Sequence, residues 1–389
     1  MRNHFYYQLT TRYQFIFICI FFTIGLSIYG QGQQESLYNL IIGTYTRPGG
    51  GEGIYVYEFN TQTGEFKYKS VATGVSNPSY LAVSKDEKFV YSVSEIGNGM
   101  GSVSSFTLNG KAGRLEFLNQ MSSGGNGPCY ISTDDEGKYV FVANFGGGNL
   151  SAIPIEADGS LGPSIQSIRH QGRSVTGNQT RSHVHATVLS QDGKHLYVPD
   201  MGEDKIYSYN VDVNNPNPLT PANFPYLKVT PGNGPRHLEM HPNKDFAYVI
   251  HEPTDRITVI STANGLETVQ SIDLTSPDHK VGKSPSEASD IHISPDGKFL
   301  YGSLRGRSNE IVLFMIKKDG TLEYIDRYST LGKSPRNFVI DPTGNFLLVG
   351  NLGTNEIRIF RRDKKTGKLE PMPNPIKVGM PACLKFTKI

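Results

Sequence analysis

A repeated unit of two adjacent strands recurs along most of the sequence. Each copy has a turn that often contains proline, a short strand, a turn rich in Asp, Pro and Gly, and a second strand rich in Tyr, Phe and Val. Six copies, separated by 50, 56, 51, 53 and 47 residues, start at Asn77, Gly127, His183, Gly234, Glu287 and Ser334. Two further strand-like stretches follow each copy, as in residues 308–329. Four strands make one blade of a β-propeller, so the repeat predicts an all-β ring of blades.

The two ends of the chain complete each other in this scheme. The last ten residues, MPACLKFTKI, supply only a first strand, whereas residues 38–46, 53–60 and 64–72 supply the three strands that it lacks. We therefore expect a seven-bladed β-propeller in which N-terminal strands and the C-terminal strand share the last blade, as one domain over residues 31–389. The alternative, an irregular β-sandwich, would make the alignment of the copies accidental. The 42 glycines, 23 prolines and 19% charged residues fit short strands and many turns, and exclude a disordered chain or a helical bundle.

Residues 1–30 have the pattern of an export signal. Arg2 and Arg12 precede or border an apolar run, FIFICIFFTIGLSI, at residues 15–28, and small residues with a polar QGQQES segment follow. The run is shorter than the roughly 20 residues of a spanning helix, so we expect a cleaved signal peptide and a periplasmic or secreted protein. An uncleaved anchor is the alternative.

Removal of this segment leaves a formally neutral chain, because Lys and Arg fall from 38 to 36 while Asp and Glu remain 36. We expect no nucleic-acid partner and no membrane association after signal cleavage. The remaining cysteines, Cys129 and Cys383, stand on first strands of different blades with another blade between them. The two should therefore be free thiols.

Superposition of the copies predicts which side chains meet at the centre of the ring. The first strand of a blade lines the channel, and the turn before it shares a face with the turn after the second strand. We call the first-strand residues the axial positions: Ser79, Cys129, His185, Arg236, Ser289, Arg336 and Ala382. We call the residues that follow the second strand the rim positions: Tyr45, Glu95, Phe145, Met201, Glu252, Arg305 and Leu352. The position before the rim adds Thr44, Asn144, Asp200, His251 and Asn351.

Strongly polar groups concentrate in the blades that start at His183, Gly234, Glu287 and Ser334. The side chains expected to point into one funnel are those of His185, Arg236, Glu252, Arg305 and Arg336. A purely structural ring would reuse similar residues at equivalent positions, so this asymmetry predicts a ligand site.

Other interpretations of these residues remain open. His183 and His185 could bind a metal with His237 or His251, but a third ligand at fixed spacing is missing, and we predict no metal and no cofactor. Arg236 and Glu252 could form a structural ion pair. Arg336 could anchor a turn.

Five stretches carry a family resemblance: residues 127–150, 182–202, 234–252, 292–306 and 334–369. Their more specific parts are SHVHATV at residues 182–188 and GPRH at 234–237 with HE at 251–252. They resemble the lactonase family of seven-bladed propellers, which includes bacterial 6-phosphogluconolactonases and is related to fungal carboxymuconate lactonizing enzymes. The likeness spans nearly the whole mature chain. One departure is His251, where the family often has Asn.

The resemblance implies a hydrolase that opens a small-molecule sugar lactone in carbohydrate metabolism, with a catalytic cluster of His185, Arg236, Glu252 and Arg305. The neighbouring residues expected to bind substrate are His183, His237, His251, Arg336, Asn144 and Asp200. Glu252 is expected to be a general base or orienter, and His185 a general acid or base. An exported enzyme would meet unphosphorylated lactones, and we expect a monomer or a weak homodimer. The alternatives are a non-catalytic exported propeller that binds a ligand or protein, and a lactonizing enzyme acting on unsaturated dicarboxylates.

Overall fold

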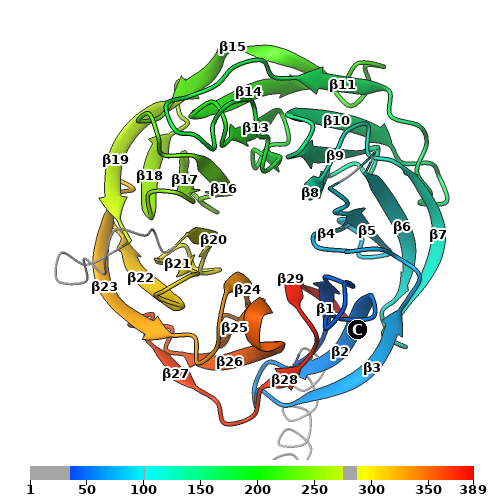
Figure 1. Ribbon diagram of the computed structural model, residues 1–389. Helices are drawn as coiled ribbons and strands as arrows, with labels where there is room; N and C mark the ends of the chain where they lie inside the picture. Colours follow the sequence, from blue (N-terminus) through cyan, green and yellow to red (C-terminus); the bar gives the residue numbers. More distant parts are fainter. Residues whose placement is uncertain (1–35, 98, 100, 275–286) are drawn as a thin grey trace, which may run out of the picture.

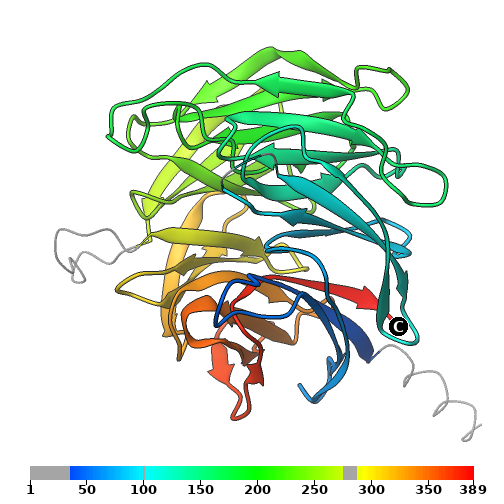
Figure 2. The same ribbon diagram turned by 45° about the vertical axis from the view of Figure 1, so that its right-hand side comes forward.

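Seven antiparallel sheets surround a central axis in the computed structural model, which describes residues 36–97, 99, 101–274 and 287–389 (Figure 1). The all-β, seven-bladed prediction is thereby confirmed. Figure 2 shows the same ring from a second angle, with the sheets stacked side by side around it. The predicted signal segment, residues 1–30, lies outside the described residues. Within the described part, no helix has the length and apolar character needed to cross a membrane.

The blades follow the chain in order, and each runs outward from the axis. Blade 1 contains β4 (Leu81–Val83), β5 (Phe89–Ser94), β6 (Ser102–Asn109) and β7 (Arg114–Ser122). Blade 2 contains β8 (Pro128–Thr133), β9 (Tyr139–Asn144), β10 (Asn149–Pro154) and β11 (Gln166–Arg169). Blade 3 contains β12 (Val188–Leu189), β13 (His195–Asp200), β14 (Lys205–Val211) and β15 (Leu219–Lys228).

The second half of the ring has the same plan. Blade 4 contains β16 (Pro235–Met240), β17 (Phe246–His251), β18 (Arg256–Ser261) and β19 (Glu267–Asp273). Blade 5 contains β20 (Ala288–Ile293), β21 (Phe299–Leu304), β22 (Glu310–Ile316) and β23 (Leu322–Ser329). Blade 6 contains β24 (Pro335–Ile340), β25 (Phe346–Asn351), β26 (Glu356–Arg362), β27 (Leu369–Pro371) and β28 (Ile376–Lys377), with a 3₁₀ turn, η2, at Leu352–Thr354.

Blade 7 is the shared blade. Its innermost strand is β29 (Pro381–Lys388), followed by β1 (Leu37–Thr44), β2 (Ile54–Asn60) and β3 (Phe66–Ala72). Strand β29 pairs with β1 from Tyr38 opposite Lys388 to Gly43 opposite Cys383. Figure 1 shows these two strands, from opposite ends of the chain, side by side. The predicted closure is confirmed, and it removes the two open sheet edges that a linear array would leave.

The hydrophobic core lies between blades, on both faces of the second strands. Every residue of β9, β21 and β25 is buried, because each of these strands is covered by a neighbouring blade on either side. Such strands read as continuous apolar runs, such as VFVA at residues 140–143 and FLLV at residues 346–349. The outermost strands β3, β7 and β19 have mostly exposed or half-buried residues, as sheet edges facing water do.

An equivalent backbone hydrogen bond joins two turns in each of the seven blades, at the face of the ring that carries the axial and rim positions. In each blade the rim residue donates its backbone N–H to the carbonyl oxygen of the residue two before the axial position, as Glu252 does to Gly234 at 3.1 Å. In six blades that acceptor residue has a positive φ, including Gly127 and Gly234 at about 60°, a backbone conformation that glycine adopts without strain. The turn before the first strand and the turn after the second strand are thus tied together, which fixes axial and rim side chains at one face.

Blade 3 departs from the predicted pattern. A continuous first strand was expected from His183, but the pairing is limited to Val188–Leu189 and an isolated bridge between Val184 and Asp200. Pro199 explains the gap. Its carbonyl accepts from His185 N at 3.0 Å, so its nitrogen faces the same strand, yet proline has no N–H to continue the ladder.

Cys129 and Cys383 are free and buried, as predicted from their places on different blades.

Candidate active site

Most axial side chains are presented by β-bulges in the innermost strands. In blade 4, Pro235 pairs with His251 and His237 pairs with Ile250, so Arg236 has no partner in the ladder. The same register shift leaves out Cys129, Arg336 and Ala382 in their blades. An extra residue in a strand bends it locally and redirects its own side chain. The bulge therefore turns the axial residue away from the blade and toward the centre of the ring.

One carboxylate joins two arginines at this centre. Glu252 Oε2 lies 2.8 Å from Arg236 Nε and 3.0 Å from Arg305 Nη2. The first contact is a hydrogen bond, whereas Arg305 Nη2 is buried and has no hydrogen bond of acceptable angle among the described residues. The Glu252 side chain is 24% exposed, so the cluster is open to the funnel.

A buried chain of contacts holds Arg236 from below. Arg236 Nη1 donates to Ser289 O at 2.5 Å and to His237 Nε2 at 2.9 Å. His237 Nδ1 donates to Asp290 Oδ1 at 2.7 Å, which leaves Nε2 as the acceptor for the guanidinium. These contacts fix both the tautomer of His237 and the direction of the Arg236 fork.

His185 lies beside this cluster and is only 6% exposed. Its ring makes edge contacts with the rings of Phe145 and His237, each at 5.3 Å between centroids. Its Nδ1 is 3.8 Å from the Cys129 thiol, and its Nε2 has no hydrogen-bond partner among the described residues. The Nε2 atom is therefore the nitrogen available to a ligand.

A second carboxylate cluster faces the funnel from blades 1, 6 and 7. Glu95 Oε2 accepts hydrogen bonds from Tyr45 OH at 2.7 Å and from Ser79 Oγ at 2.5 Å, and Arg336 Nη2 lies 3.4 Å away. The Arg336 guanidinium also stands over the Tyr45 ring at 5.3 Å. Blades 1 and 6 are not adjacent, so their contact shows that these side chains meet across the ring.

The electrostatic setting favours an ionised Glu252 and a neutral His185. Burial alone would raise the pKa of Glu252, but Arg305, Arg236 and Arg336 together lower it. Burial, reinforced by Arg236, His237 and Arg336, lowers the pKa of His185 well below its usual value.

Arg236 and Arg336 remain charged at neutral pH. Burial and the neighbouring guanidinium groups lower the pKa of Arg236 to about 10, against the raising effect of Glu252. Burial works in the same direction on Arg336, but Tyr45, Glu95 and Glu252 raise its pKa above the ordinary range. Three guanidinium groups and two carboxyl groups thus meet near the centre of the ring.

Stacked rings lie beneath the site. Tyr80 and Tyr130 stack at 4.1 Å, and His237 packs edge-on against Tyr130 at 5.3 Å. Blades 2 and 4, which carry Tyr130 and His237, are separated by blade 3, so the two rings meet across the channel. These rings pack together around the axis next to His237, which in turn bonds Arg236.

Two residues expected to bind substrate lie elsewhere. Asn144 and His251 have no exposed surface. Asn144 Nδ2 donates to Ser123 O at 3.2 Å, and His251 Nε2 contacts Thr258 Oγ1 at 2.7 Å. Both precede a rim residue, and alternation along a strand turns them into the body of the blade. We therefore leave both out of the site.

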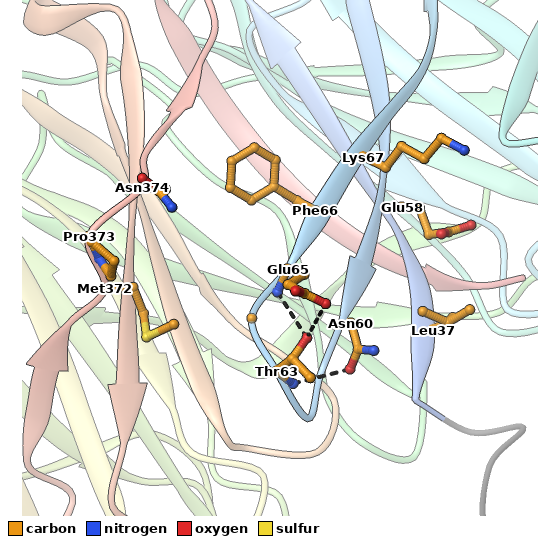
Figure 3. Close-up of a pocket in the computed structure, with 11 residues that line it drawn as sticks. Leu37, Glu58, Asn60, Thr63, Glu65, Phe66, Lys67, Met372, Pro373 and Asn374 are labelled. Atoms are coloured by element: carbon orange, nitrogen blue, oxygen red, sulfur yellow. Dashed lines mark hydrogen bonds between the residues drawn. The ribbon is translucent and has the colours of Figure 1, made fainter.

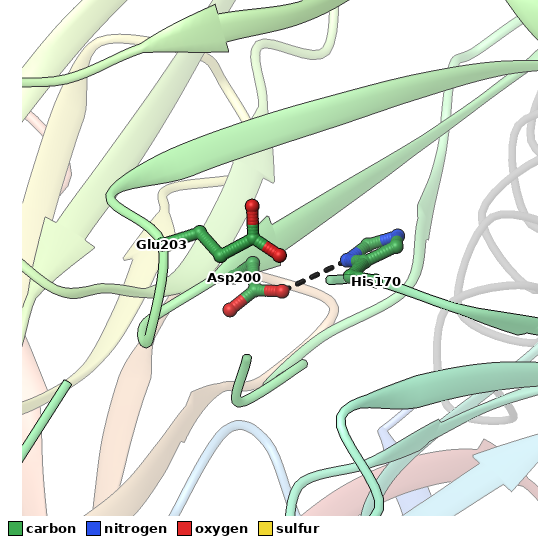
Figure 4. A group of neighbouring side chains, drawn as sticks. All are labelled: His170, Asp200 and Glu203. Carbon is green, nitrogen blue, oxygen red and sulfur yellow. Dashed lines mark hydrogen bonds and ion pairs between the residues drawn. The ribbon is translucent and has the colours of Figure 1, made fainter. Parts of the chain in front are cut away.

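Asp200 is the third such residue, and it stabilises a loop. Figure 4 shows its carboxylate next to the His170 ring, with Glu203 beside them. Asp200 accepts hydrogen bonds from His170 Nδ1 at 2.8 Å, from Ser182 Oγ and from the backbone N–H of His183 at 2.8 Å. Since His170 Nε2 is also bonded, to Tyr209 OH at 2.8 Å, this group of possible metal ligands already has partners for most of its atoms. The arrangement is that of a structural hydrogen-bond network.

The remaining expected residues lie at or below the site. His183 stacks on Phe145 at 4.4 Å, and its Nδ1 donates to Phe145 O at 3.1 Å, which places it at the rim. His237 is 4% exposed and supports Arg236 through a hydrogen bond. Arg336 belongs to the second carboxylate cluster.

Tyr45, Ser79 and Glu95 were not among the predicted site residues. All three stand at axial or rim positions, and Glu95 occupies in blade 1 the position that Glu252 occupies in blade 4. The signal was present as a second acidic residue in the same frame. The prediction concentrated on blades with several charged residues. It did not include Glu95, because two partners of Glu95 are the uncharged residues Ser79 and Tyr45.

A separate cavity of about 670 Å³ lies far from this funnel, between the β2–β3 hairpin and the segment around Met372 (Figure 3). Figure 3 shows Glu58, Lys67 and Phe66 around it. It shares no residue with the axial or rim positions.

Comparisons with known proteins agree with this architecture. Residues 39–386 match the family described as lactonase, 7-bladed beta-propeller. The chain is 33% identical over 348 residues to a 6-phosphogluconolactonase of Bacillus subtilis, covering 89% of this chain and 97% of that protein. It is 35% identical to a 6-phosphogluconolactonase of Formosa agariphila, covering 89% and 99%.

Among solved structures, the periplasmic gluconolactonase of Pseudomonas aeruginosa is similar with a TM-score of 0.85 and 35% identity, covering 90% of this chain and 99% of that one. The family match spans almost all of the described residues, and the bulged axial positions explain how one ring can present a polar site. The chain belongs to the lactonase family of seven-bladed β-propellers.

Proposed function

We propose that the protein hydrolyses a sugar lactone in the axial funnel. The observation that carries the proposal is the convergence of Arg236 and Arg305 on one carboxylate, Glu252, beside a neutral His185. Lactone hydrolysis needs a group that accepts a proton from water and donors that stabilise the oxyanion formed at the carbonyl. The funnel contains both kinds of group.

His185 Nε2 is the proton acceptor in this proposal. As water adds to the lactone carbonyl, one of its protons passes to His185, and the carbonyl oxygen becomes an oxyanion. The same imidazolium then returns the proton to the ring oxygen as the carbon–oxygen bond breaks. The products are the open-chain hydroxy acid and the regenerated neutral histidine, with one water consumed.

Arg305 and Arg236 stabilise the oxyanion. Arg305 Nη2 is buried, lies 3.0 Å from Glu252 Oε2 and lacks an aligned hydrogen bond, so in this proposal its N–H group turns toward the carbonyl oxygen when the lactone binds. A charged donor that is already in place costs no reorganisation when the oxyanion forms. Glu252 keeps the two guanidinium groups near each other despite their like charge, and its lowered pKa makes it a better orienter than base.

We also propose that the enzyme is exported. The support is the apolar run in residues 15–28 with its flanking residues, and a similar structure is that of a periplasmic gluconolactonase. Cell fractionation with antibody detection tests this point, and recovery of full-length protein in the cytosol would contradict it.

Substitution of Arg305 tests the catalytic proposal. We expect Arg305→Ala to lower kcat for glucono-1,5-lactone by about 100- to 1000-fold, because one oxyanion donor is removed. The measurement is acid release followed in a weakly buffered solution, corrected for spontaneous hydrolysis. Arg307→Ala is the matched control, since Arg307 is an exposed arginine two residues away, and it should leave kcat unchanged.

A panel of sugar lactones and muconates, assayed in both directions, separates the alternatives. Ligand binding without turnover, together with no rate loss in Glu252→Gln, would identify a non-catalytic propeller. Formation of a lactone from an unsaturated dicarboxylate would identify a lactonizing enzyme. Either result would overturn the hydrolase proposal.

A further inference from the structure

We propose that Glu95, supported by Tyr45, Ser79 and Arg336, forms a hydroxyl-binding subsite that selects neutral polyhydroxy lactones over phosphorylated ones. The inference deepens the proposed function and rests on it, because it assigns the part of the funnel that the hydrolytic cluster does not use.

The geometry of Glu95 leaves one oxygen for a ligand. Its Oε2 accepts two short hydrogen bonds, from Tyr45 and Ser79, and approaches Arg336. Its Oε1 has no partner among the described residues, although the side chain is 26% exposed. A carboxylate held rigidly through one oxygen presents the other in a fixed direction, which is what recognition of a ligand hydroxyl requires.

The charge balance of the funnel argues against a phosphate dianion. Three guanidinium groups face two carboxylates, so the net charge is three minus two, or one positive charge. Each guanidinium already contacts a carboxylate. Among these five side chains, the single excess charge matches the oxyanion that hydrolysis creates, and it is smaller than the charge of about −2 on a phosphate monoester.

The exposed atoms point to the same ligand class. The Glu95 and Glu252 side chains are 26% and 24% exposed, whereas those of Arg336 and Arg305 are 17% and 11% exposed. A ligand entering the funnel therefore meets carboxylate oxygens at least as readily as guanidinium groups. Carboxylates only accept hydrogen bonds, so sugar hydroxyls, which donate, are favoured, and phosphate oxygens are repelled.

The test compares two substrates in the wild type and in three variants. We expect the wild type to have a higher kcat/KM for glucono-1,5-lactone than for its 6-phosphate. Glu95→Gln should lower kcat/KM for the neutral lactone about tenfold or more, chiefly through a higher KM. The ratio of kcat/KM for the phosphorylated lactone to kcat/KM for the neutral lactone should rise. Glu116→Gln is the control, because Glu116 is an exposed glutamate on the outer strand of the same blade. Tyr45→Phe, which keeps the Glu95 charge, should give a smaller loss.

The outcomes separate the subsite from the hydrolytic proposal. A wild type that prefers the phosphorylated lactone, or an unchanged preference in Glu95→Gln, would overturn the subsite while leaving lactone hydrolysis intact. If the wild type hydrolyses neither substrate, the proposed function fails. The subsite is then judged by calorimetry with gluconolactam, a neutral ring that cannot be hydrolysed. Weaker lactam binding in Glu95→Gln, with an unchanged melting temperature, would support it, and equal binding would refute it.

Discussion

At the scale of single residues, burial determines which form of each histidine is present. His185 and His237 are buried next to Arg236, and their pKa values are lowered, to about 3 for His237. His292 shows the opposite outcome. Burial favours its neutral form, but Asp290 and Glu239 raise its pKa to about 10, so a charged imidazole lies on β20, the innermost strand of blade 5. His237 also contacts Asp290, but burial and Arg236 outweigh the effect of that carboxylate, whereas Glu239 adds to it at His292.

The acidity of His185 gives a prediction for the pH–rate profile. Because its pKa lies well below 6.5, the neutral base persists as the pH falls through the ordinary histidine range. We expect kcat/KM, corrected for spontaneous hydrolysis, to stay level from about pH 8 to about pH 6. An acidic limb centred near the ordinary histidine pKa would show that the base is not this buried residue. His185→Gln should give a lower rate without any such limb.

His251 should make the fold sensitive to acid. Burial, followed by Arg256, lowers its pKa to about 3, so between that value and the ordinary pKa the unfolded chain binds a proton that the folded chain does not. Stability from this group is complete above the ordinary pKa and declines by about 1.4 kcal/mol per pH unit as the pH falls through this window.

We expect His251→Asn to lose less stability than the wild type between about pH 6.5 and about pH 4. Urea unfolding of both proteins across this range measures the effect, with neutral pH as the reference. Parallel pH dependences in the two proteins would contradict the assignment.

At the scale of strands and turns, the repeat predicted most of the strand arrangement, because apolar runs and DG turns mark each blade in the sequence. The seven sheets, the shared blade and the convergence of Arg236, Glu252 and Arg305 all followed from superposing the copies. The bulge was not predictable, since a register shift of one residue leaves the apolar pattern of the strand intact. Asn144, Asp200 and His251 were misplaced for a related reason, because the superposition gives the position along a strand but not which face a side chain takes.

Blade 3 shows the limit of the repeat as a guide. The stretch from His183 reads as a strand like its counterparts, but Pro199 on the neighbouring strand cannot donate the hydrogen bond that would complete it. The interruption falls beside His185, so the backbone that presents this residue differs from that of the other axial positions. The proline that interrupts the strand lies on its pairing partner, 14 residues after His185 in the same copy of the repeat.

At the scale of the whole molecule, ring closure depends on one strand. Leu384 of β29 is 1% exposed and packs with Leu40, Ile42 and residues of blade 6. The strand therefore joins the last blade to the first residues of the domain and completes the core between blades 6 and 7. The predicted monomer or weak dimer, and the predicted signal segment, stay predictions.

Weakening this closure should destabilise the protein. We expect Leu384→Ala to lower the free energy of unfolding by about 2 to 5 kcal/mol, because it leaves a cavity in a closed core. Ile389→Ala, at an exposed side chain just beyond the strand, should change it by less than about 0.5 kcal/mol. Chemical denaturation followed by circular dichroism compares the two. Equal effects would mean that the ring does not rely on β29.

In the bulged first strands, the backbone sets the direction of the axial side chain, whatever the residue type is. Backbone register sends Cys129 and Ala382 toward the same centre as the two arginines, although a thiol and a methyl group contribute little chemistry there. Both side chains are buried, 5% and 2% exposed, so a donor or acceptor of similar size is the replacement that these positions can take without displacing their neighbours. Diversification within such a ring can therefore proceed by exchange of the residues at the axial positions, while the surrounding blades keep their sequence pattern.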